Sequence, residues 1–273
     1  MKISFLGGGN MAAALIGGLL AKGFPAADLQ VAELSEAGRA SLEERFSVRA
    51  VPALDEAALA CDLLVLAVKP QQMREALAAL AGKLSRQVVV SIAAGLRVDD
   101  LSRWLGGHRR LVRCMPNTPA LIGAGMTGLY ADPSVDEPGR AAAQTVLAAV
   151  GDTVWVAHEG QMDAVTALSG SGPAYVFHFI EALEAAGVEL GFESAIARRL
   201  AIGTVLGAAR LASASEDGPA VLRERVTSKG GTTAAALQQM AADGFLPLVS
   251  RALKAAEARG RELGDQLGRD GAA

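Results

Sequence analysis

Hydrophobic residues in the first half of the chain form short, nearly unbroken runs separated by helical patterns. Strands that are apolar on both faces are typical of a parallel sheet covered by helices on each side, because a half-exposed sheet alternates apolar and polar residues. The alternation therefore predicts an α/β fold with a Rossmann-type, doubly wound parallel sheet. The runs are ISFL at 3–6, LQVAEL at 29–34, DLLVLAV at 62–68, VVVSIA at 88–93 and RLVRCM at 110–115.

Two more strands are expected at 126–130 and 154–156, as a hairpin or a further strand pair, with a helix over 138–149 between them. After them only helical patterns remain, and a chain of 273 residues suits two domains. We therefore expect a dinucleotide-binding domain at 1–157 and an all-helical dimerisation and substrate domain at 158–273. The helices are expected at 160–191, 193–214, 219–227, 232–242 and 246–267.

The segment 174–186 is apolar on most sides, which is hard to satisfy inside a small helical domain. We interpret it as a surface covered by a second copy of the chain, in a homodimer or a larger homo-oligomer built from dimers. Burial within its own chain is the alternative. A second helix carries small and apolar residues on one face, which permits close helix packing: Ala197, Leu200, Ala201, Thr204, Ala208 and Leu211.

Composition narrows the classes of partner. A net charge of -3 gives no basic surplus for a phosphate backbone, so no nucleic acid is expected. Cys61 and Cys114 lack a CxxC or Cys/His setting, which predicts no metal and a reducing, cytoplasmic location. The apolar N-terminus is interrupted by glycines, and no stretch reaches the roughly 20 apolar residues that span a bilayer, so no membrane partner is expected.

A glycine motif follows the first predicted strand directly. Gly7, Gly9 and Ala12 form a G-x-G-x-x-A pattern between a strand and a helix, which is the context that a dinucleotide fingerprint requires. Gly7 permits the tight turn, and Gly9 lets the backbone approach a pyrophosphate. The pyrophosphate would bind the free amides of the helix that begins near Asn10.

The choice between NADH and NADPH stays open in the sequence. Glu33 ends the second strand, where an acid hydrogen-bonds the adenosine ribose of NAD. Ser35 and Arg39 follow closely and suit a 2′-phosphate, so we expect NADP(H) to be slightly preferred and NAD(H) to be usable.

Three more loops follow predicted strands and border the edge of the sheet where open α/β folds bind ligands. They are Ala67–Pro70, Ser91–Gly95 and Met115–Pro119. Each is also compatible with an ordinary structural turn, and Lys69 with a solvated lysine.

A second glycine pair lies in the helical half. Gly230 and Gly231 precede the helix that starts near Thr232, and accessible amides at a helix N-terminus attract a carboxylate. The alternative is that Ser228, Thr232 and Thr233 only cap this helix.

Taken together, the fingerprint, AVKP, SIAAG, RCMPNTPAL, AVTALSGSGPAY, GTVLGAA and VTSKGGTTAAAL resemble the pyrroline-5-carboxylate reductase family in order and spacing from end to end. The resemblance implies NAD(P)H-dependent reduction of 1-pyrroline-5-carboxylate, a small cyclic imino acid, to L-proline, the last step of proline biosynthesis. It places substrate at Glu159, Ser228, Gly230, Gly231, Thr232 and Thr233. It places the coenzyme at Leu6, Gly7, Gly8, Gly9, Asn10, Met11, Ser35, Ala67, Val68, Lys69, Pro70, Ala94 and Asn117.

Two positions depart from the family pattern. Lys229 stands where relatives usually have proline, which removes a ring constraint from the loop and adds a cation. Leu54 stands where relatives often carry an asparagine toward the coenzyme.

The chemistry that the resemblance implies needs no protein nucleophile, because the coenzyme carries it and the protein orients the reactants. Thr233, with Ser228 near it, is our candidate to hold or supply the proton at the ring nitrogen. Two alternatives stay open. A β-hydroxyacid dehydrogenase would use a helical-domain lysine such as Lys254, and a nucleotide-sensing scaffold would bind coenzyme without turnover.

Overall fold

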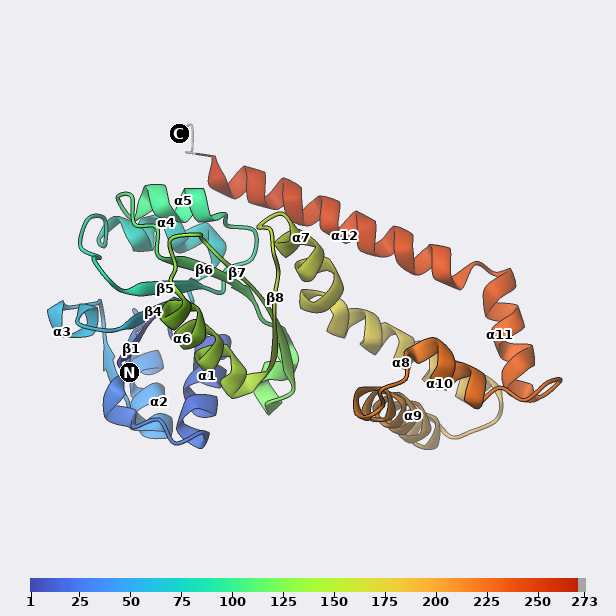
Figure 1. Ribbon diagram of the computed structural model, residues 1–273. Helices are drawn as coiled ribbons and strands as arrows, with labels where there is room; N and C mark the ends of the chain where they lie inside the picture. The colour runs from blue at the N-terminus through green and yellow to red at the C-terminus, as the bar shows by residue number, and fades with distance from the viewer. Residues whose placement is uncertain (270–273) are drawn as a thin grey trace. The chain divides into compact units, whose positions relative to one another are not determined.

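The computed structural model describes residues 1–269, and the chain divides into two compact units (Figure 1). The sheet unit comprises Met1–Ser171 and the chain from Lys254 onward, and the helical unit comprises Gly172–Leu253. The predicted division into residues 1–157 and 158–273 differs from this one in two places. The first stretch of the sheet unit continues to Ser171, and the chain returns to that unit at Lys254. Helix α7 (Gln161–Val165) contacts the sheet strands β6 and β7, and the end of α12 (Phe245–Gly268) returns to the sheet unit.

The sheet unit contains one eight-stranded sheet in the order β3-β2-β1-β4-β5-β6-β7-β8. All neighbouring pairs are parallel except β6 and β7, which are antiparallel. The predicted doubly wound parallel sheet is thereby confirmed. The strands are β1 (Ile3–Leu6), β2 (Leu29–Ala32), β3 (Arg49–Val51), β4 (Leu63–Leu66), β5 (Val88–Ser91), β6 (Leu111–Met115), β7 (Gly125–Ala131) and β8 (Gly151–Trp155).

Alternate side chains of the central strands enter two separate cores. On β4, Leu63 and Val65 pack in the cluster with α1, whereas Leu64 and Leu66 pack in the cluster with α4 and α5. Burial on both faces is why these strands are apolar at every position. The helices of the sheet unit are α1 (Asn10–Ala21), α2 (Glu36–Phe46), α3 (Glu56–Leu59), α4 (Pro70–Ala78), α5 (Val98–Trp104), α6 (Glu137–Leu147) and α7.

Strand β3 is the one that the hydrophobic pattern did not predict. It has three residues, Arg49 is exposed, and Ala50 and Val51 are only half-buried. A short strand at the edge of the sheet needs few apolar side chains, so no run marks it. Strands β7 and β8 are not a hairpin: they pair in parallel, with α6 between them in sequence.

The helices after residue 192 match the predicted ones closely, but the predicted helix 160–191 is divided into α7, a π-helix at Thr166–Gly170 and α8, and only α8 belongs to the helical unit. Its helices are α8 (Gly172–Glu189), α9 (Ser194–Ala214), α10 (Pro219–Arg225), α11 (Thr232–Ala242) and the first part of α12. Helices α8 and α9 pack together where small residues meet: a Cβ placed on Gly187 would lie 3.0 Å from Cβ of Ala197. The ion pair between Arg198 and Glu184, at 3.0 Å, lies beside this contact.

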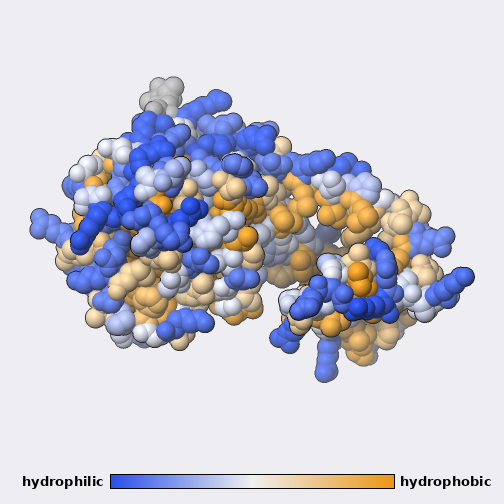
Figure 2. Space-filling view, viewed as in Figure 1, coloured by the Kyte–Doolittle hydropathy of each residue, from blue (hydrophilic) through white to orange (hydrophobic). Residues whose placement is uncertain are grey.

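Apolar side chains remain exposed over the helical unit (Figure 2). No residue of α8 is buried, so the alternative in which segment 174–186 is covered by its own chain is wrong for the described residues. Phe177, for example, is 60% exposed, and Leu190 is 81% exposed. Contiguous exposed apolar surface of this kind marks a contact with another molecule.

Candidate functional site

The fingerprint loop, Gly7–Gly9, follows β1 and lies where the strand order reverses, between β1 and β4. Gly7 has φ +102°, and its amide donates to the carbonyl of Ala32 at 2.8 Å. A Cβ on Gly7 would lie 2.9 Å from the carbonyl carbon and oxygen of Ala67. Only glycine satisfies both the backbone angle and this close approach, so the loop is fixed against the end of β4.

The N-terminus of α1 is open. Gly9 occupies the cap position with no side-chain hydrogen bond, and a Cβ placed on it would meet nothing within 4 Å. The first main-chain bond of the helix runs from the Ala13 amide to the Gly9 carbonyl at 2.9 Å. The amides of the first turn therefore have no acceptor within the helix, which suits an anionic ligand.

Glu33 is tied to the same loop. Its Oε2 accepts from the Gly8 amide and its Oε1 from the Ser35 amide, both at 2.9 Å. Arg39 donates through Nη1 to the carbonyls of Glu33 and Leu34 at 2.9 and 2.8 Å. Ser35 is exposed, and its Oγ caps α2 by accepting from the Gly38 amide at 3.2 Å. The carboxylate of Glu33, the hydroxyl of Ser35 and the guanidinium of Arg39 thus lie together at the end of β2.

The loops after β4 and β5 border the same edge. The Ala67 amide donates to the Leu6 carbonyl at 2.8 Å, and Lys69 is exposed at the cap position of α4 with Pro70 opening the helix. Ala94, after β5, is half-buried. The coenzyme residues predicted around these loops, from Leu6 to Ala94, therefore lie at one edge of one sheet.

Both polar atoms of the Asn117 side chain form hydrogen bonds with main-chain groups. Its Nδ2 donates to the Ser169 carbonyl at 3.2 Å, and its Oδ1 accepts from the Met126 amide at 2.9 Å. It is only 9% exposed. These bonds join the loop after β6 to β7 and to the π-helix Thr166–Gly170 that follows α7.

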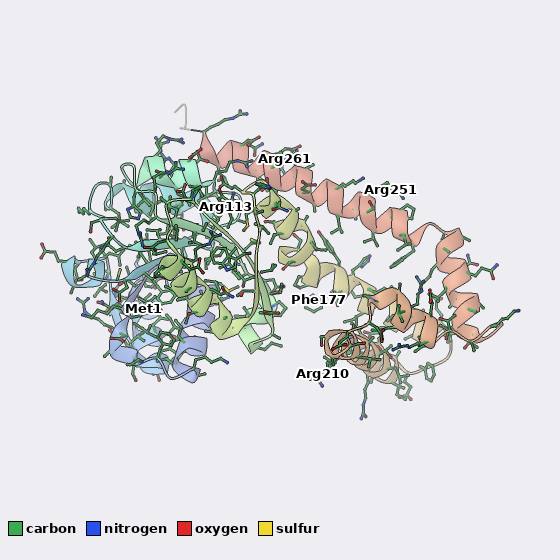
Figure 3. The ribbon with its side chains drawn as sticks, in the orientation of Figure 1. Met1, Arg113, Phe177, Arg210, Arg251 and Arg261 are labelled. Atoms are coloured by element: carbon green, nitrogen blue, oxygen red, sulfur yellow. The ribbon has the colours of Figure 1, made fainter. Side chains whose placement is uncertain are left out.

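Glu159 forms an ion pair that the sequence reading missed. Its Oε1 accepts from Arg113 Nη1 at 2.8 Å and from the Val98 amide at 2.7 Å. Arg113 is 4% exposed on β6, where Figure 3 labels it among the strands. The signal was available, because an arginine inside the apolar run LVRCM must find a partner when the strand is buried.

Replacing Glu159 with glutamine is expected to lower the free energy of unfolding by about 2 kcal/mol, because a buried arginine loses its counter-charge. Thermal unfolding of the protein without ligand measures this. Glu262→Gln is the matched control, since its pair with Arg259 is exposed on both sides and is expected to contribute little. Equal melting temperatures for the two variants would contradict the structural role of the pair.

The glycine pair of the helical unit forms a second open helix N-terminus. Gly230 has φ +74°, and Gly231 caps α11 with no side-chain hydrogen bond. The first main-chain bond of α11 runs from Ala235 to the Gly231 carbonyl at 3.1 Å, so the amides of residues 232–234 lack an acceptor within the helix. Among the described residues, no hydrogen bond joins a hydroxyl of Ser228, Thr232 or Thr233 to these amides, so the predicted alternative of hydroxyl capping gains no support.

The predicted substrate residues do not all belong to one unit. Glu159 lies in the sheet unit, together with the predicted coenzyme residues, whereas Ser228 and residues 230–233 lie in the helical unit. Ser228 and Thr232 are exposed and Thr233 is half-buried. A Cβ on Gly231 would displace the Ser228 hydroxyl, so glycine at this position leaves room for that side chain.

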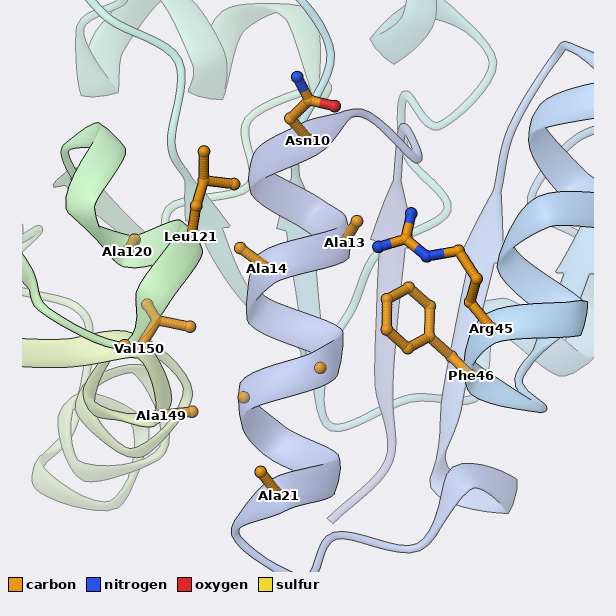
Figure 4. Close-up of a pocket in the computed structure, with 13 residues that line it drawn as sticks. Asn10, Ala13, Ala14, Ala21, Arg45, Phe46, Ala120, Leu121, Ala149 and Val150 are labelled. Atoms are coloured by element: carbon orange, nitrogen blue, oxygen red, sulfur yellow. The ribbon is translucent and has the colours of Figure 1, made fainter.

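A separate hollow runs along the side of α1, between the end of α2 and the segments that follow β6 and α6 (Figure 4). Arg45 and Phe46 line one wall, and Leu121 and Val150 line the other. The hollow shares only Asn10 with the fingerprint. Among residues 1–269, no group of three metal-ligating side chains comes together.

The parallel sheet, the fingerprint at its switch point and the two open helix N-termini define a nicotinamide-coenzyme oxidoreductase of the Rossmann class. A family model described as pyrroline-5-carboxylate reductase dimerisation matches residues 159–263, and one described as NADP oxidoreductase, coenzyme F420-dependent, matches residues 2–95. The chain belongs to the pyrroline-5-carboxylate reductase family.

Relatives that match nearly the whole chain support membership of this family. The pyrroline-5-carboxylate reductase of Pseudomonas aeruginosa is 48% identical, covering 98% of both chains, and that of Synechocystis is 42% identical, covering 97% of this chain and 98% of the relative. Among solved structures, a pyrroline-5-carboxylate reductase from Coxiella burnetii superposes with a TM-score of 0.92 at 40% identity, covering 96% of this chain and 98% of that one. The Plasmodium falciparum enzyme with NADP bound gives 0.83 at 29% identity, covering 97% and 98%.

Proposed function

We propose that this protein reduces 1-pyrroline-5-carboxylate to L-proline with NADPH or NADH. The observation that carries the proposal is the glycine-capped N-terminus of α11, where the amides of residues 232–234 lack an i−4 acceptor within the helix and Thr233 is half-buried. Relatives that share 42–48% of the sequence over nearly the whole chain are named pyrroline-5-carboxylate reductases.

The amides of α11 are assigned to the substrate carboxylate. Gly230, Gly231 and Thr232 leave these amides accessible, and the positive end of the helix favours the carboxylate over water. The carboxylate carbon is bonded to the carbon next to the ring nitrogen, so anchoring it fixes where the C=N bond lies. Orientation of this kind removes much of the entropic cost of the reaction.

The Thr233 hydroxyl is assigned to the ring nitrogen, with Ser228 supporting it. The bound coenzyme supplies a hydride to the carbon of the C=N bond. The iminium form accepts hydride more readily than the neutral imine, so the hydroxyl at nitrogen holds or supplies the proton. Glu159 is proposed to help position the substrate while it remains paired with Arg113.

The coenzyme is assigned to the edge of the sheet. The α1 amides bind the pyrophosphate, and residues 67–70, Ala94 and Asn117 line the nicotinamide side. NADPH is proposed as slightly preferred, because Ser35 and Arg39 stand at the end of β2. The carboxylate of Glu33 opposes a 2′-phosphate and keeps NADH usable.

Glu33→Gln is expected to shift the coenzyme preference about tenfold toward NADPH, because one negative charge beside the 2′-position disappears. The ratio of kcat/KM values for NADPH and NADH measures the shift. Glu36→Gln, at the exposed first turn of α2, is the control for a charge change nearby. An unchanged ratio in Glu33→Gln would show that this acid does not face the ribose.

The assembly is proposed to be a homodimer, or a larger homo-oligomer built from dimers, through the exposed apolar surface of the helical unit. The family model that matches residues 159–263 is described as a dimerisation domain. Cys61 and Cys114 are free and buried, in keeping with the cytoplasmic location that we propose. No helix in residues 1–269 has the length and hydropathy to cross a bilayer.

The test of the function is coenzyme oxidation by the purified protein. NADPH and NADH are offered with pyrroline-5-carboxylate and, separately, with ketoacids that a β-hydroxyacid dehydrogenase reduces. Turnover with pyrroline-5-carboxylate alone is the expected result. Coenzyme binding without any turnover would instead support a nucleotide-sensing scaffold and refute the proposal.

A further inference from the structure

Three glycines of α12 share one face of the helix. Gly260, Gly264 and Gly268 are spaced four residues apart, and this end of α12 belongs to the sheet unit. Figure 1 shows the end of α12 beside α5. A Cβ on Gly268 would collide with the Asp100 carboxylate, so the helix approaches α5 closely.

At Gly264 the helix backbone touches the loop that follows β5. A Cβ on Gly264 would lie 2.7 Å from the Gly95 carbonyl oxygen, and a Cβ on Gly95 would lie 3.4 Å from the Gly264 Cα. Gly95 has φ +82°, and both glycines are buried. No side chain separates the two backbones, so a displacement of the helix must displace the loop.

Ion pairs and hydrogen bonds of Arg97 and Arg103 surround the same contact between α12 and the loop after β5. Arg97 Nη2 donates to Asp265 Oδ1 at 2.9 Å, and Arg97 Nη1 lies 3.8 Å from Asp163 Oδ2 on α7. The Asp163 side chain is 4% exposed, so this carboxylate is a fixed point within the unit. Arg103 on α5 donates to the Gly268 carbonyl at 2.8 Å.

We infer that Gly264 is a positioning residue for the coenzyme: by contacting Gly95 through bare backbone, it sets the place of the adjoining Ala94 at the nicotinamide side of the site. The inference rests on the proposed function, because it takes residue 94 to line the bound coenzyme. Gly264 itself touches the loop and not the reactants. A change at Gly264 should therefore alter the Kd for the coenzyme.

The test compares two alanine variants on one helix. Gly264→Ala must push against the Gly95 carbonyl, whereas a Cβ on Gly260 would meet only the Asp163 Cβ, at 4.0 Å. Both changes replace a glycine within the same helix, so they alter helix propensity alike. We expect Gly264→Ala to weaken NADPH binding about tenfold, and Gly260→Ala to leave it unchanged.

NADPH binding is followed by nicotinamide fluorescence without substrate, and the KM for pyrroline-5-carboxylate is measured at saturating coenzyme. A raised coenzyme Kd with an unchanged substrate KM and melting temperature supports the inference. Asp265→Asn, which removes the Arg97 ion pair from an exposed position, is expected to raise the same Kd about twofold.

Equal affinities in Gly264→Ala and Gly260→Ala would overturn the inference. So would a collapse of the melting temperature in Gly264→Ala together with an unchanged Kd in Asp265→Asn, since the contact would then only support the fold. If the unaltered protein binds neither coenzyme, the proposed function itself fails.

Discussion

Gly9→Ala is expected to weaken coenzyme binding about 100-fold, equivalent to about 2.7 kcal/mol, while leaving the protein as stable as before. The added methyl group meets no protein atom within 4 Å, so the fold has no reason to change. It projects into the open space before the α1 amides, where we propose that the pyrophosphate approaches the backbone. Fluorescence titration with NADPH and thermal unfolding without ligand measure the two quantities.

Two further variants make this result specific. Gly218→Ala is the matched control, because Gly218 is also an N-cap glycine with φ -67° and open space around it. Gly7→Ala should behave differently and lose stability, since φ is +102° and the Ala67 carbonyl lies in the way. Unimpaired coenzyme binding by Gly9→Ala would refute the pyrophosphate site at α1.

Thr233→Ala is expected to lower kcat for pyrroline-5-carboxylate about 100-fold, the usual contribution of a positioned proton-transfer group. Coenzyme affinity should stay unchanged, because Thr233 lies on α11 of the helical unit and the fingerprint lies in the sheet unit. Steady-state kinetics with saturating NADPH measure the effect. The dependence of kcat on pH should change as well, because the proton at the ring nitrogen would then come from solvent.

The conservative variant Thr233→Ser keeps a hydroxyl and should retain most of the activity. Thr227→Ala controls for loss of a nearby threonine, since that hydroxyl donates to the carbonyl of Arg223 on α10. If Thr233→Ala turns over as fast as the unaltered protein, the hydroxyl has no part in the reaction. The anchoring amides of α11 would then be the whole contribution of this segment.

Strands and helices were predictable wherever burial dictated the pattern. Leu63–Leu66 is buried at every position, so its apolar run could mean only a covered strand or a core helix, and its length and β-branched neighbours favoured the strand. Strand β3 escaped because Arg49–Val51 lies at the sheet edge and buries little. One boundary differs for another reason: β2 ends at Ala32 although its hydrophobic run continues to residue 34, and the Glu33 side chain accepts from the Gly8 amide.

The site was predictable as far as it depends on local geometry. Gly7 holds a position that needs a tight turn and a close approach, and Gly9 and Gly231 each leave the start of a helix uncapped by a side chain; a short motif shows both features. The pairing of Glu159 with Arg113 and the contact of Gly264 with Gly95 join residues far apart in the chain. The sequence shows that a buried Arg113 needs an acidic partner. Only the fold shows that this partner is Glu159.

The sheet unit is discontinuous in the chain, since the end of α12, which lies against Gly95, begins at Lys254. During synthesis, Met1–Ser171 emerges from the ribosome long before that segment, and an N-terminal domain generally begins to fold first. A nascent chain stalled ahead of residue 254 would thus contain the whole sheet but lack the backbone contact at Gly95. If Gly264 positions this loop as we infer, the Ala94 loop reaches its final place only after residue 264 has been synthesised.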